Sequence, residues 1–254
     1  MSISWTKIRN DITAILRDEN SKGTVFAISG GVDSIFLLDM INRSSVLQEF
    51  THSNRVFLAH FNHLPGQIMD DRANEFVERE CKRIGVSEFL QVGYGNPAMG
   101  KTSASFEAEA RRARYRYFNS LFDAEDKRPC HIVTAHNLSD QIEGILMGLC
   151  RGVPINCTPM AYKTEFHLNS GNKVIIHRPL LGITKEKIIK HATLRGLTWD
   201  EDETNRDEKF ERNFFRHAVV PLLLSKRNIY KSIPKSVATP RKIVIDQGTL
   251  FEDN

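Results

Sequence analysis

The 254-residue sequence predicts an α/β fold with a doubly wound, mainly parallel sheet and a helical C-terminal extension. Short apolar runs alternate with amphipathic segments of helical length, which is the pattern of parallel strands joined by right-handed crossover helices. The first apolar run ends at a glycine pair, Gly30-Gly31, just before a helical segment. Because ligands bind beyond the carboxyl ends of the strands in such sheets, this turn is the first candidate site.

The elements are expected in regular alternation. Apolar residues at helical spacing predict a helix over 5–19, and a continuous apolar run predicts a strand over 24–29. The same criteria predict strands over 56–60, 88–92, 130–135 and 173–176. Helices are expected over 33–42, 73–84, 105–122, 142–149 and 184–196, with Ser105 and Thr184 as N-caps and Gly85 and Gly196 as C-caps.

The composition excludes several classes of protein. Lys and Arg number 35 against 31 Asp and Glu, a mild basic excess that permits a polyanionic partner without requiring one. The four cysteines form no CxxC pair, so no disulfide scaffold, zinc site or iron–sulfur cluster is expected. No apolar run is long enough to span a bilayer, and the N-terminus lacks the apolar core of a signal peptide. We therefore expect a cytoplasmic protein, or one in the equivalent soluble compartment of an organelle or host cell, without a membrane partner.

The glycine turn, residues 29–34, has the composition of a phosphate-binding loop. Its glycines allow a tight turn that points successive N–H groups at one place, and the helix that follows adds a positive dipole. Ser29 and Ser34 can add hydroxyl donors. Asp33 suits an anion site only together with Mg²⁺ or another cation. From residue types alone, an ordinary strand-to-helix turn stays open as the alternative.

Residues 29–34 resemble the SGGxDS loop of the PP-loop ATP pyrophosphatases, which cleave ATP between its α and β phosphates. Further segments are similar to the tRNA(Ile)-lysidine synthetases of that superfamily, in the same order over residues 23–224. They are 60–63 (HFNH), 109–115 (EARRARY), 135–143 (AHNLSDQIE), 151–152 (RG), 178–181 (RPLL) and 202–223 (DETNRDEKFERNFFRHAVVPLL).

The resemblance implies a Rossmann-like PP-loop catalytic domain over residues 1–224. Residues 225–254 are then a short tail, basic and then acidic, without a further globular domain. The implied activity is that of a ligase: the C2 oxygen of a cytidine attacks the α-phosphate of ATP, and the amine of lysine then displaces AMP. The implied cofactors and partners are ATP, Mg²⁺, L-lysine and a tRNA-Ile with a CAU anticodon, whose wobble cytidine is modified.

The sequence departs from the family pattern at several positions. Gly144 replaces the Thr of an expected Glu-Thr pair, Leu64-Pro65-Gly66 replaces the usual Gly-Leu-Arg, and Lys185 stands where Arg is common. Family members often carry further C-terminal domains that help to hold tRNA, and after residues 221–223 we expect no such domain.

The resemblance assigns roles to residues that match its motifs. Catalytic roles fall to Asp33, Asp140, Glu143, Arg111 and Arg114. ATP binding falls to Ser29, Gly30, Gly31, Val32, Asp33, Ser34, His60, Asn62, His63 and His136, with Asp33 as the Mg²⁺ ligand. We further expect tRNA contacts from Arg178, Arg212, Arg216, Lys226, Arg227 and Lys231.

Asp140 and Glu143 are three residues apart on a predicted helix and therefore share one face. By residue type alone, a solvated acidic helix start is the more ordinary interpretation. The resemblance favours lysine binding, either through the α-amine or by positioning and deprotonating the ε-amine.

Two other activities stay open: a tRNA thiolase of the same superfamily, and a non-catalytic tRNA-binding relative. The sequence lacks the paired cysteines of many thiolases, and mere RNA binding needs no pyrophosphate loop. A homodimer is also left open. Residues 225–254 hold six Lys or Arg against three Asp or Glu, so this tail carries most of the net charge of +4. We expect it to contact tRNA phosphates, the alternative being a frayed terminus.

Overall fold

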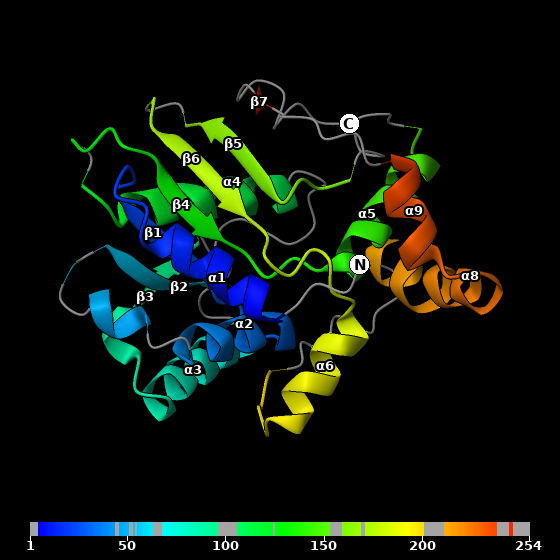
Figure 1. Cartoon of the computed structure of the whole chain (residues 1–254), viewed down its shortest axis with the longest axis horizontal. Helices are drawn as coiled ribbons and strands as arrows, with labels where there is room; N and C mark the ends of the chain where they lie inside the picture. Colours follow the sequence, from blue (N-terminus) through cyan, green and yellow to red (C-terminus); the bar gives the residue numbers. More distant parts are fainter. Residues whose placement is uncertain are drawn as a thin grey trace.

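The computed structural model describes residues 5–43, 46–50, 53, 55–62, 68–95, 106–123, 125–152, 159–168, 171–200, 211–237 and 244–245. It confirms the predicted class, since one mainly parallel sheet carries helices on both faces (Figure 1). Within those residues, no helix is both long enough and apolar enough to cross a lipid bilayer.

The sheet has seven strands in the order β3-β2-β1-β4-β6-β5-β7. Neighbouring strands from β3 to β6 run parallel, and β5 is antiparallel to β6. The strands are β1 (Gly23–Ala27), β2 (Val56–Asn62), β3 (Leu90–Tyr94), β4 (Cys130–Val133), β5 (Lys163–His167), β6 (Lys173–His177) and β7 (Val244–Ile245). The two strands that follow β1 in the chain, β2 and β3, lie on one side of β1. The later strands β4 and β6 lie on its other side. The strand order therefore reverses between β1 and β4, where sheets of this kind hold their ligands.

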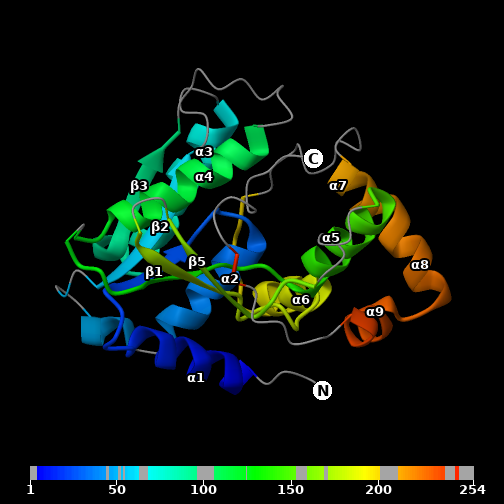
Figure 2. The same ribbon diagram turned by 90° about the horizontal axis from the view of Figure 1, so that it is seen from above.

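Helices cover both faces of the sheet. One core joins α1 (Trp5–Leu16), α2 (Val32–Asn42), α3 (Ile68–Arg83) and α6 (Lys185–Leu194) to the sheet and includes Phe36 and Leu58, both fully buried. A second core packs α4 (Phe106–Ser120) on the opposite face through Tyr115 and Phe118. Figure 2 shows α1 and α4 on opposite sides of the strands. Among the residues that the structure describes, η1 (Val46–Phe50) and η2 (Ser87–Phe89) are short 3-10 helices.

A separate helical group lies beside α5 (Leu138–Cys150) (Figure 2). It consists of α7 (Glu211–Phe214), a π-helical turn η5 (Phe215–Val219), α8 (Val220–Lys226) and α9 (Ile229–Val237). Ile142 of α5 forms a third buried cluster with Val220 and Ile229. The predicted boundary at residue 224 lies inside α8, and residues 229–237 of the predicted tail are a helix packed on α5.

Several element ends differ from the sequence-based expectation. β2 runs on to Asn62, so His60 and Asn62 belong to the strand and do not follow it. Thr184 occupies the N-cap of α6, but its side chain makes no capping hydrogen bond. β5 was not expected, because Phe166 is its one buried side chain and polar residues fill the rest. Ser105 lies outside the described residues.

Two histidines are buried side by side on β4 and β6. His177 Nε2 lies 3.0 Å from His131 Nδ1, and the two rings stack with their centroids 4.9 Å apart. The carboxylate of Asp18 lies 3.2 Å from His131 Nε2. Burial lowers the pKa of both histidines, that of His177 to about 3. The folded protein therefore holds His177 neutral across the physiological range.

We expect the free energy of unfolding to fall as the pH drops from about 6.5 toward about 3. The unfolded chain binds protons near the ordinary histidine pKa, whereas folded His177 does not, so acid favours the unfolded state. At pH 5, His177 alone should cost on the order of 2 kcal/mol relative to pH 7.5. Urea denaturation at the two pH values measures the difference.

His177→Gln should reduce this pH dependence, because glutamine does not titrate. His167→Gln is the matched control, since His167 is an exposed histidine on the neighbouring strand β5. An equal loss of stability at pH 5 in both variants would contradict the assignment to the buried pair.

Candidate active site

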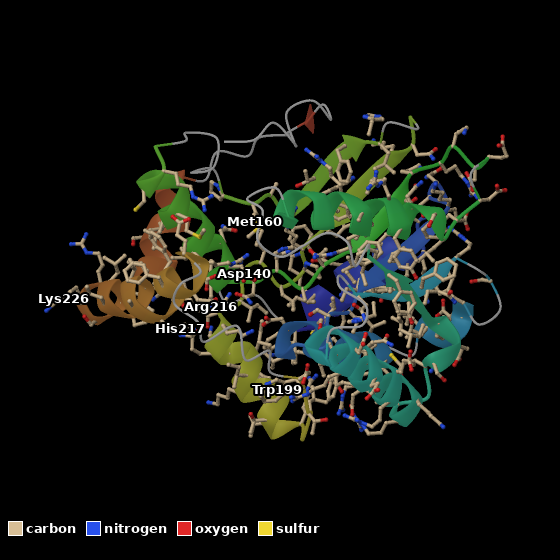
Figure 3. The ribbon with its side chains drawn as sticks, turned by 180° about the vertical axis from the view of Figure 1, so that it is seen from behind. Asp140, Met160, Trp199, Arg216, His217 and Lys226 are labelled. Atoms are coloured by element: carbon tan, nitrogen blue, oxygen red, sulfur yellow. The ribbon has the colours of Figure 1, made fainter. Side chains whose placement is uncertain are left out.

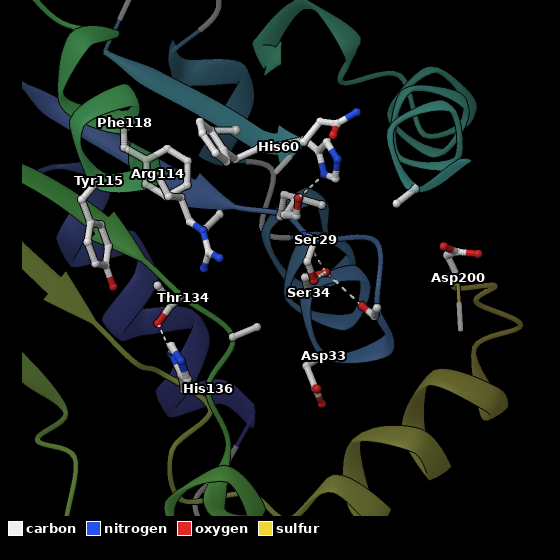
Figure 4. A pocket seen from close by; sticks show the side chains of 18 of the residues that line it. Ser29, Asp33, Ser34, His60, Arg114, Tyr115, Phe118, Thr134, His136 and Asp200 are labelled. Carbon is white, nitrogen blue, oxygen red and sulfur yellow. Dashed lines mark hydrogen bonds between the residues drawn. The ribbon is translucent and has the colours of Figure 1, made fainter. Parts of the chain in front are cut away.

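A cavity of about 430 Å³ opens at the carboxyl ends of β1, β2 and β4, where the strand order reverses (Figure 4). It brings together predicted residues from segments far apart in the sequence. Those that line it are Ser29, Gly31, Asp33, Ser34, His60, Asn62, Arg114, His136 and Asp140. The sheet topology brings the residues after β1, β2 and β4 together, because the carboxyl ends of parallel strands lie at the same edge of the sheet.

The glycine turn is held in shape by its own serine. Ser34 Oγ accepts hydrogen bonds from the N–H groups of Ser29 and Gly30, both at 3.1 Å, and donates to the carbonyl oxygen of Gly31. Gly30 has a φ of +93°, which residues with a Cβ rarely adopt. The hydroxyl that the sequence suggested as a phosphate donor thus supports the loop from within.

Helix α2 starts at this turn without a side-chain cap. Its N-cap is Gly31, which has no side chain to accept from the first N–H groups of the helix. Uncapped N–H groups at the positive end of a helix dipole suit a phosphate. The turn therefore keeps the anion-binding features that its sequence predicted.

Asp33, in the first turn of α2, faces Lys185 at the start of α6. Lys185 Nζ lies 2.6 Å from Asp33 Oδ2, whereas Asp33 Oδ1 is buried and has no hydrogen-bond partner. Burial raises the pKa of Asp33, and the ammonium of Lys185 opposes that rise. One carboxylate oxygen is thus neutralised by a cation, and the other is buried without a hydrogen-bond partner.

The unpartnered Oδ1 of Asp33 fits an Mg²⁺ ion. Mg²⁺ is usually held by one or two carboxylates together with substrate phosphates and water, so a single carboxylate beside a phosphate-binding turn is enough. Among the described residues, no group of three or more His, Cys, Asp or Glu side chains is arranged to hold a metal on its own. An ion here would depend on ligands that the nucleotide brings.

Asp140 is fixed by the cap of its own helix. The side chain of Asn137 accepts from the N–H groups of Ser139 and Asp140, and Asp140 Oδ2 accepts from the N–H of Asn137 at 2.9 Å. This capping box satisfies donors at both ends of the first turn. The ordinary role of a carboxylate at a helix start therefore applies to one oxygen of Asp140, Oδ2.

Arg212 and Arg216 neutralise the two carboxylates of α5. Arg212 donates to Asp140 Oδ1 at 2.9 Å and to Glu143 Oε2 at 3.0 Å. Arg216 donates to both oxygens of Glu143, at 2.9 and 3.0 Å, and its Nη2 lies 3.6 Å from Asp140 Oδ1. Figure 3 shows Asp140 and Arg216 together at the junction of α5 with the C-terminal helices. We call these four residues the acid–arginine cluster.

The π-helical turn carries Arg216 and interrupts the helix between α7 and α8. Pro221 lies at the start of α8 and brings no N–H to the preceding turn, which disfavours regular α-helical bonding there. Turns of this kind occur often at functional sites. Here the turn lies directly over Glu143, which is 3% exposed.

Other polar side chains that line the cavity are held by hydrogen bonds. His60 Nδ1 lies 2.9 Å from the carbonyl oxygen of Ile28, which favours the tautomer with a proton on Nδ1. Asn62 donates to Asp71 at 2.8 Å, and Thr134 Oγ1 lies 2.8 Å from His136 Nδ1. Figure 4 shows Arg114 reaching from α4 toward the centre of the cavity.

Other predicted site residues lie elsewhere. Arg178 is buried and donates to the carbonyl oxygen of Ala161 and to Thr164, contacts that favour a role in holding β5 against β6. Lys226, Arg227 and Lys231 are exposed at the ends of α8 and α9. His63 and the segment 202–210 lie outside the described residues, as does the side chain of Arg111.

Two residues at the site were not predicted. Lys185 was noted only as a departure from the family pattern. A lysine in the first turn of a helix lies at the positive end of the helix dipole, which is unfavourable unless a carboxylate is close by. Its position in the sequence therefore indicated a nearby carboxylate. Asp200 lines the cavity, pairs with Arg72 at 3.1 Å, and donates its N–H to the carbonyl oxygen of Gly30. It opens an acidic run, which in sequence resembles a solvated loop.

Comparisons with known proteins agree with this geometry. Residues 5–223 match a family model described as a PP-loop domain. The tRNA(Ile)-lysidine synthase of Legionella pneumophila (strain Paris) is 31% identical over 213 residues, which cover 84% of this chain and 45% of that protein. The tRNA(Ile)-lysidine synthase of Anaplasma marginale (strain St. Maries) is 32% identical over 79% of this chain and 40% of its own length. The chain thus spans less than half the length of these relatives, and the matches confirm the resemblance seen in the motifs.

A solved structure supports the fold. The U34-tRNA thiolase NcsA from Methanococcus maripaludis, determined with its [4Fe-4S] cluster, superposes with a TM-score of 0.54 and 14% identity. The superposition covers 88% of this chain and 80% of the thiolase. At this identity the likeness concerns the fold alone.

We expect Lys185→Met to weaken MgATP binding by about tenfold or more and to move the acid limb of the pH profile upward. Without the ammonium, burial raises the pKa of Asp33 further, so its ionised form needs a higher pH. Lys185→Arg should keep most of the affinity, because it keeps the charge. Calorimetric titration of MgATP from pH 5.5 to 8.5 measures both effects, and an unshifted profile for Lys185→Met would rule out this role.

We expect Gly144→Ala to stabilise the protein by about 0.5–1 kcal/mol. Gly144 lies inside α5, and an added Cβ would meet no atom of the described structure within 4 Å. The substitution therefore removes the entropic cost of a helical glycine without a clash. Thermal denaturation measures the change, and a lower melting temperature would show that this position requires glycine.

Proposed function

The chain belongs to the PP-loop domain family, and from this premise we propose that it is an ATP-dependent ligase that modifies tRNA. The proposed reaction adenylates a cytidine, the wobble base of a tRNA-Ile with a CAU anticodon, and then attaches lysine through a carbon–nitrogen bond. The observation that carries the proposal is one cavity lined by both the glycine turn with Asp33 and the amine-binding candidate Asp140. Such a cavity suits a reaction between a nucleoside triphosphate and an amine.

In the first step, the C2 oxygen of the cytidine attacks the α-phosphate of ATP and pyrophosphate leaves. Catalysis of phosphoryl transfer rests on positioning and charge neutralisation. The uncapped start of α2 and the ammonium of Lys185 supply positive charge for the phosphates, and Arg114 reaches the same cavity. Asp33 Oδ1 would hold Mg²⁺, which supplies further neutralisation when bound.

In the second step, the ε-amine of lysine attacks C2 of the adenylated cytidine. The new C2–N bond replaces the C2–O bond, AMP leaves with the oxygen, and the amine gives up its protons to water or to a base in the cavity. Asp140 and Glu143 are the carboxylates that we assign to lysine, since ammonium groups are attracted to paired acids. Arg212 and Arg216 hold these carboxylates in the free protein.

We assign contacts with tRNA to the exposed cations of the C-terminal helices, Lys226, Arg227 and Lys231. They belong to α8 and α9, which lie beside α5 (Figure 1). Phosphate contacts of this type need charge and exposure but no fixed geometry.

The likeness to a tRNA thiolase concerns the fold alone. Cys81 and Cys130 are both buried, and burial raises the pKa of each thiol to about 12. This pKa disfavours thiolate chemistry at either cysteine.

The test is incubation of the protein with ATP, Mg²⁺, lysine and an unmodified transcript bearing a CAU anticodon. We expect AMP release that requires both lysine and the transcript, and Asp33→Asn should reduce it by about a hundredfold or more, a typical loss for a group that stabilises transition-state charge. Asp11→Asn, which alters an ion pair on α1, is the control. ATP consumption without lysine dependence would favour a thiolase-like activity, and none at all would favour a non-catalytic tRNA-binding role.

A further inference from the structure

Helix α6 begins at Lys185 without a cap of its own. Thr184 occupies the N-cap, but its side chain makes no capping hydrogen bond. The N–H of Lys185 instead donates to the hydroxyl of Ser139, which belongs to α5, at 3.1 Å. A side-chain oxygen that accepts from the first turn of a helix is what an N-cap residue normally provides. Here another helix provides it, so the start of α6 depends on α5.

The hydroxyl of Tyr230, on α9, completes this contact. Ser139 Oγ lies 3.1 Å from Tyr230 Oη, and Tyr230 donates its only proton to Glu186 Oε1 at 3.3 Å. Because that proton is used, Tyr230 accepts from Ser139, whose lone pairs remain for the N–H of Lys185. Lys185 and Glu186 are neighbours on α6, so the three hydrogen bonds close a ring across α5, α6 and α9. We call it the hydroxyl ring.

The hydroxyl ring holds the backbone of the residue that neutralises Asp33. From that backbone, the side chain of Lys185 reaches Asp33 Oδ2 at 2.6 Å. A lysine side chain is long and flexible, and that of Lys185 is 35% exposed, so packing alone does not fix it. A short charge-assisted hydrogen bond also weakens steeply when its geometry is disturbed. The position of the backbone therefore decides how well ammonium and carboxylate meet.

We propose that Tyr230 is a positioning residue of the ATP site, which acts through Ser139 and Lys185. It keeps the ammonium of Lys185 against Asp33 although it does not reach the nucleotide itself. The inference rests on the proposed function, because it takes MgATP as the ligand of this site. It also extends the site to α9, since none of the described residues that line the cavity belongs to that helix.

Apolar packing gives the Tyr230 hydroxyl a fixed place. Ile229 is 6% exposed and forms a buried cluster with Ile142 of α5, and the partly buried ring of Tyr230 packs against the same cluster. A tyrosine with an anchored ring presents its hydroxyl at a defined point. Tyr230→Phe therefore removes the hydrogen bonds and leaves the anchor of α9 in place.

A rival route runs through α5 itself. Ser139 is followed directly by Asp140 of the acid–arginine cluster, so a disturbed α5 would alter the cavity without any part played by Lys185. The capping box of Asn137 and Asp140 opposes such a disturbance, because it holds the start of α5 without the Ser139 hydroxyl. The two routes give different results once the ammonium of Lys185 is removed.

The first experiment measures the affinity of the full-length protein for MgATP by calorimetric titration. We expect Tyr230→Phe to weaken binding by about three- to tenfold, the loss typical of one hydrogen bond. Tyr162→Phe is the matched control, because Tyr162 also donates to a carboxylate, that of Asp11 at 3.0 Å, and neither residue lines the cavity. An unchanged affinity in Tyr230→Phe, or an equal loss in Tyr162→Phe, would overturn the proposal.

The second experiment repeats the substitution in Lys185→Met. If Tyr230 acts through Lys185, Tyr230→Phe should change the MgATP affinity of that variant by less than about twofold. Ser139→Ala should weaken binding at least as much as Tyr230→Phe, and the double variant should lose little more, because both hydroxyls belong to one ring. An equal effect of Tyr230→Phe with and without the ammonium would assign it to α5 and contradict the proposed route.

Hydrogen exchange separates this inference from the proposed function, because it needs no nucleotide. The amide of Lys185 should exchange at least about threefold faster in Tyr230→Phe, whereas that of Thr134, which donates to the carbonyl oxygen of His177, should not change. If exchange and MgATP affinity respond but no lysine-dependent AMP is released, the positioning role stands and the proposed reaction fails. If AMP is released as expected and neither responds, the proposed function stands and this inference fails.

Discussion

A buried carboxylate on α5 holds the start of the C-terminal helical group in place. Glu143 is 3% exposed, and an ionised carboxylate at that depth requires positive partners and hydrogen bonds. Both partners, Arg212 and Arg216, come from a segment about seventy residues further along the chain. Their attraction to Glu143 holds α7 and the π-helical turn over α5, and the apolar contacts of Ile142 with Val220 and Ile229 continue the same interface. Charge neutralisation and apolar burial thus fix the C-terminal helices in one position.

Most of the sheet could be predicted from the sequence, because its central strands are buried on both faces and appear as continuous apolar runs. β1 and β4 are of this type, with Val25 and Ile132 fully buried. β5 could not be predicted, since it is antiparallel near the edge and shows polar residues with Phe166 alone buried. The π-helical turn was also unpredictable, because it reflects packing around Pro221 and no periodicity marks it.

In the candidate site, too, features set by neighbouring residues could be predicted, whereas contacts between residues far apart in the sequence could not. Residues in the turn after β1 were predicted because a glycine turn is a local pattern, and those after β4 because segment 135–143 resembles a family motif. The pairing of Lys185 with Asp33 joins positions 152 residues apart, and no local pattern encodes it. The same holds for Arg212 and Arg216, whose predicted role was contact with an external polyanion and whose observed partners are the acids of α5. Residue type indicated the charge of each group but not its partner.

One hydroxyl group links the late part of the chain to the early part. Ser139 Oγ accepts from the N–H of Lys185 and lies 3.1 Å from Tyr230 Oη, which also donates to Glu186. Helices α5, α6 and α9 therefore meet at a single atom. During synthesis, strands β1 to β6 and the glycine turn can fold before residue 230 has left the ribosome, whereas the contact of Ser139 with Tyr230 forms only afterwards. The central strands and the glycine turn can therefore form before the contacts that join α5, α6 and α9.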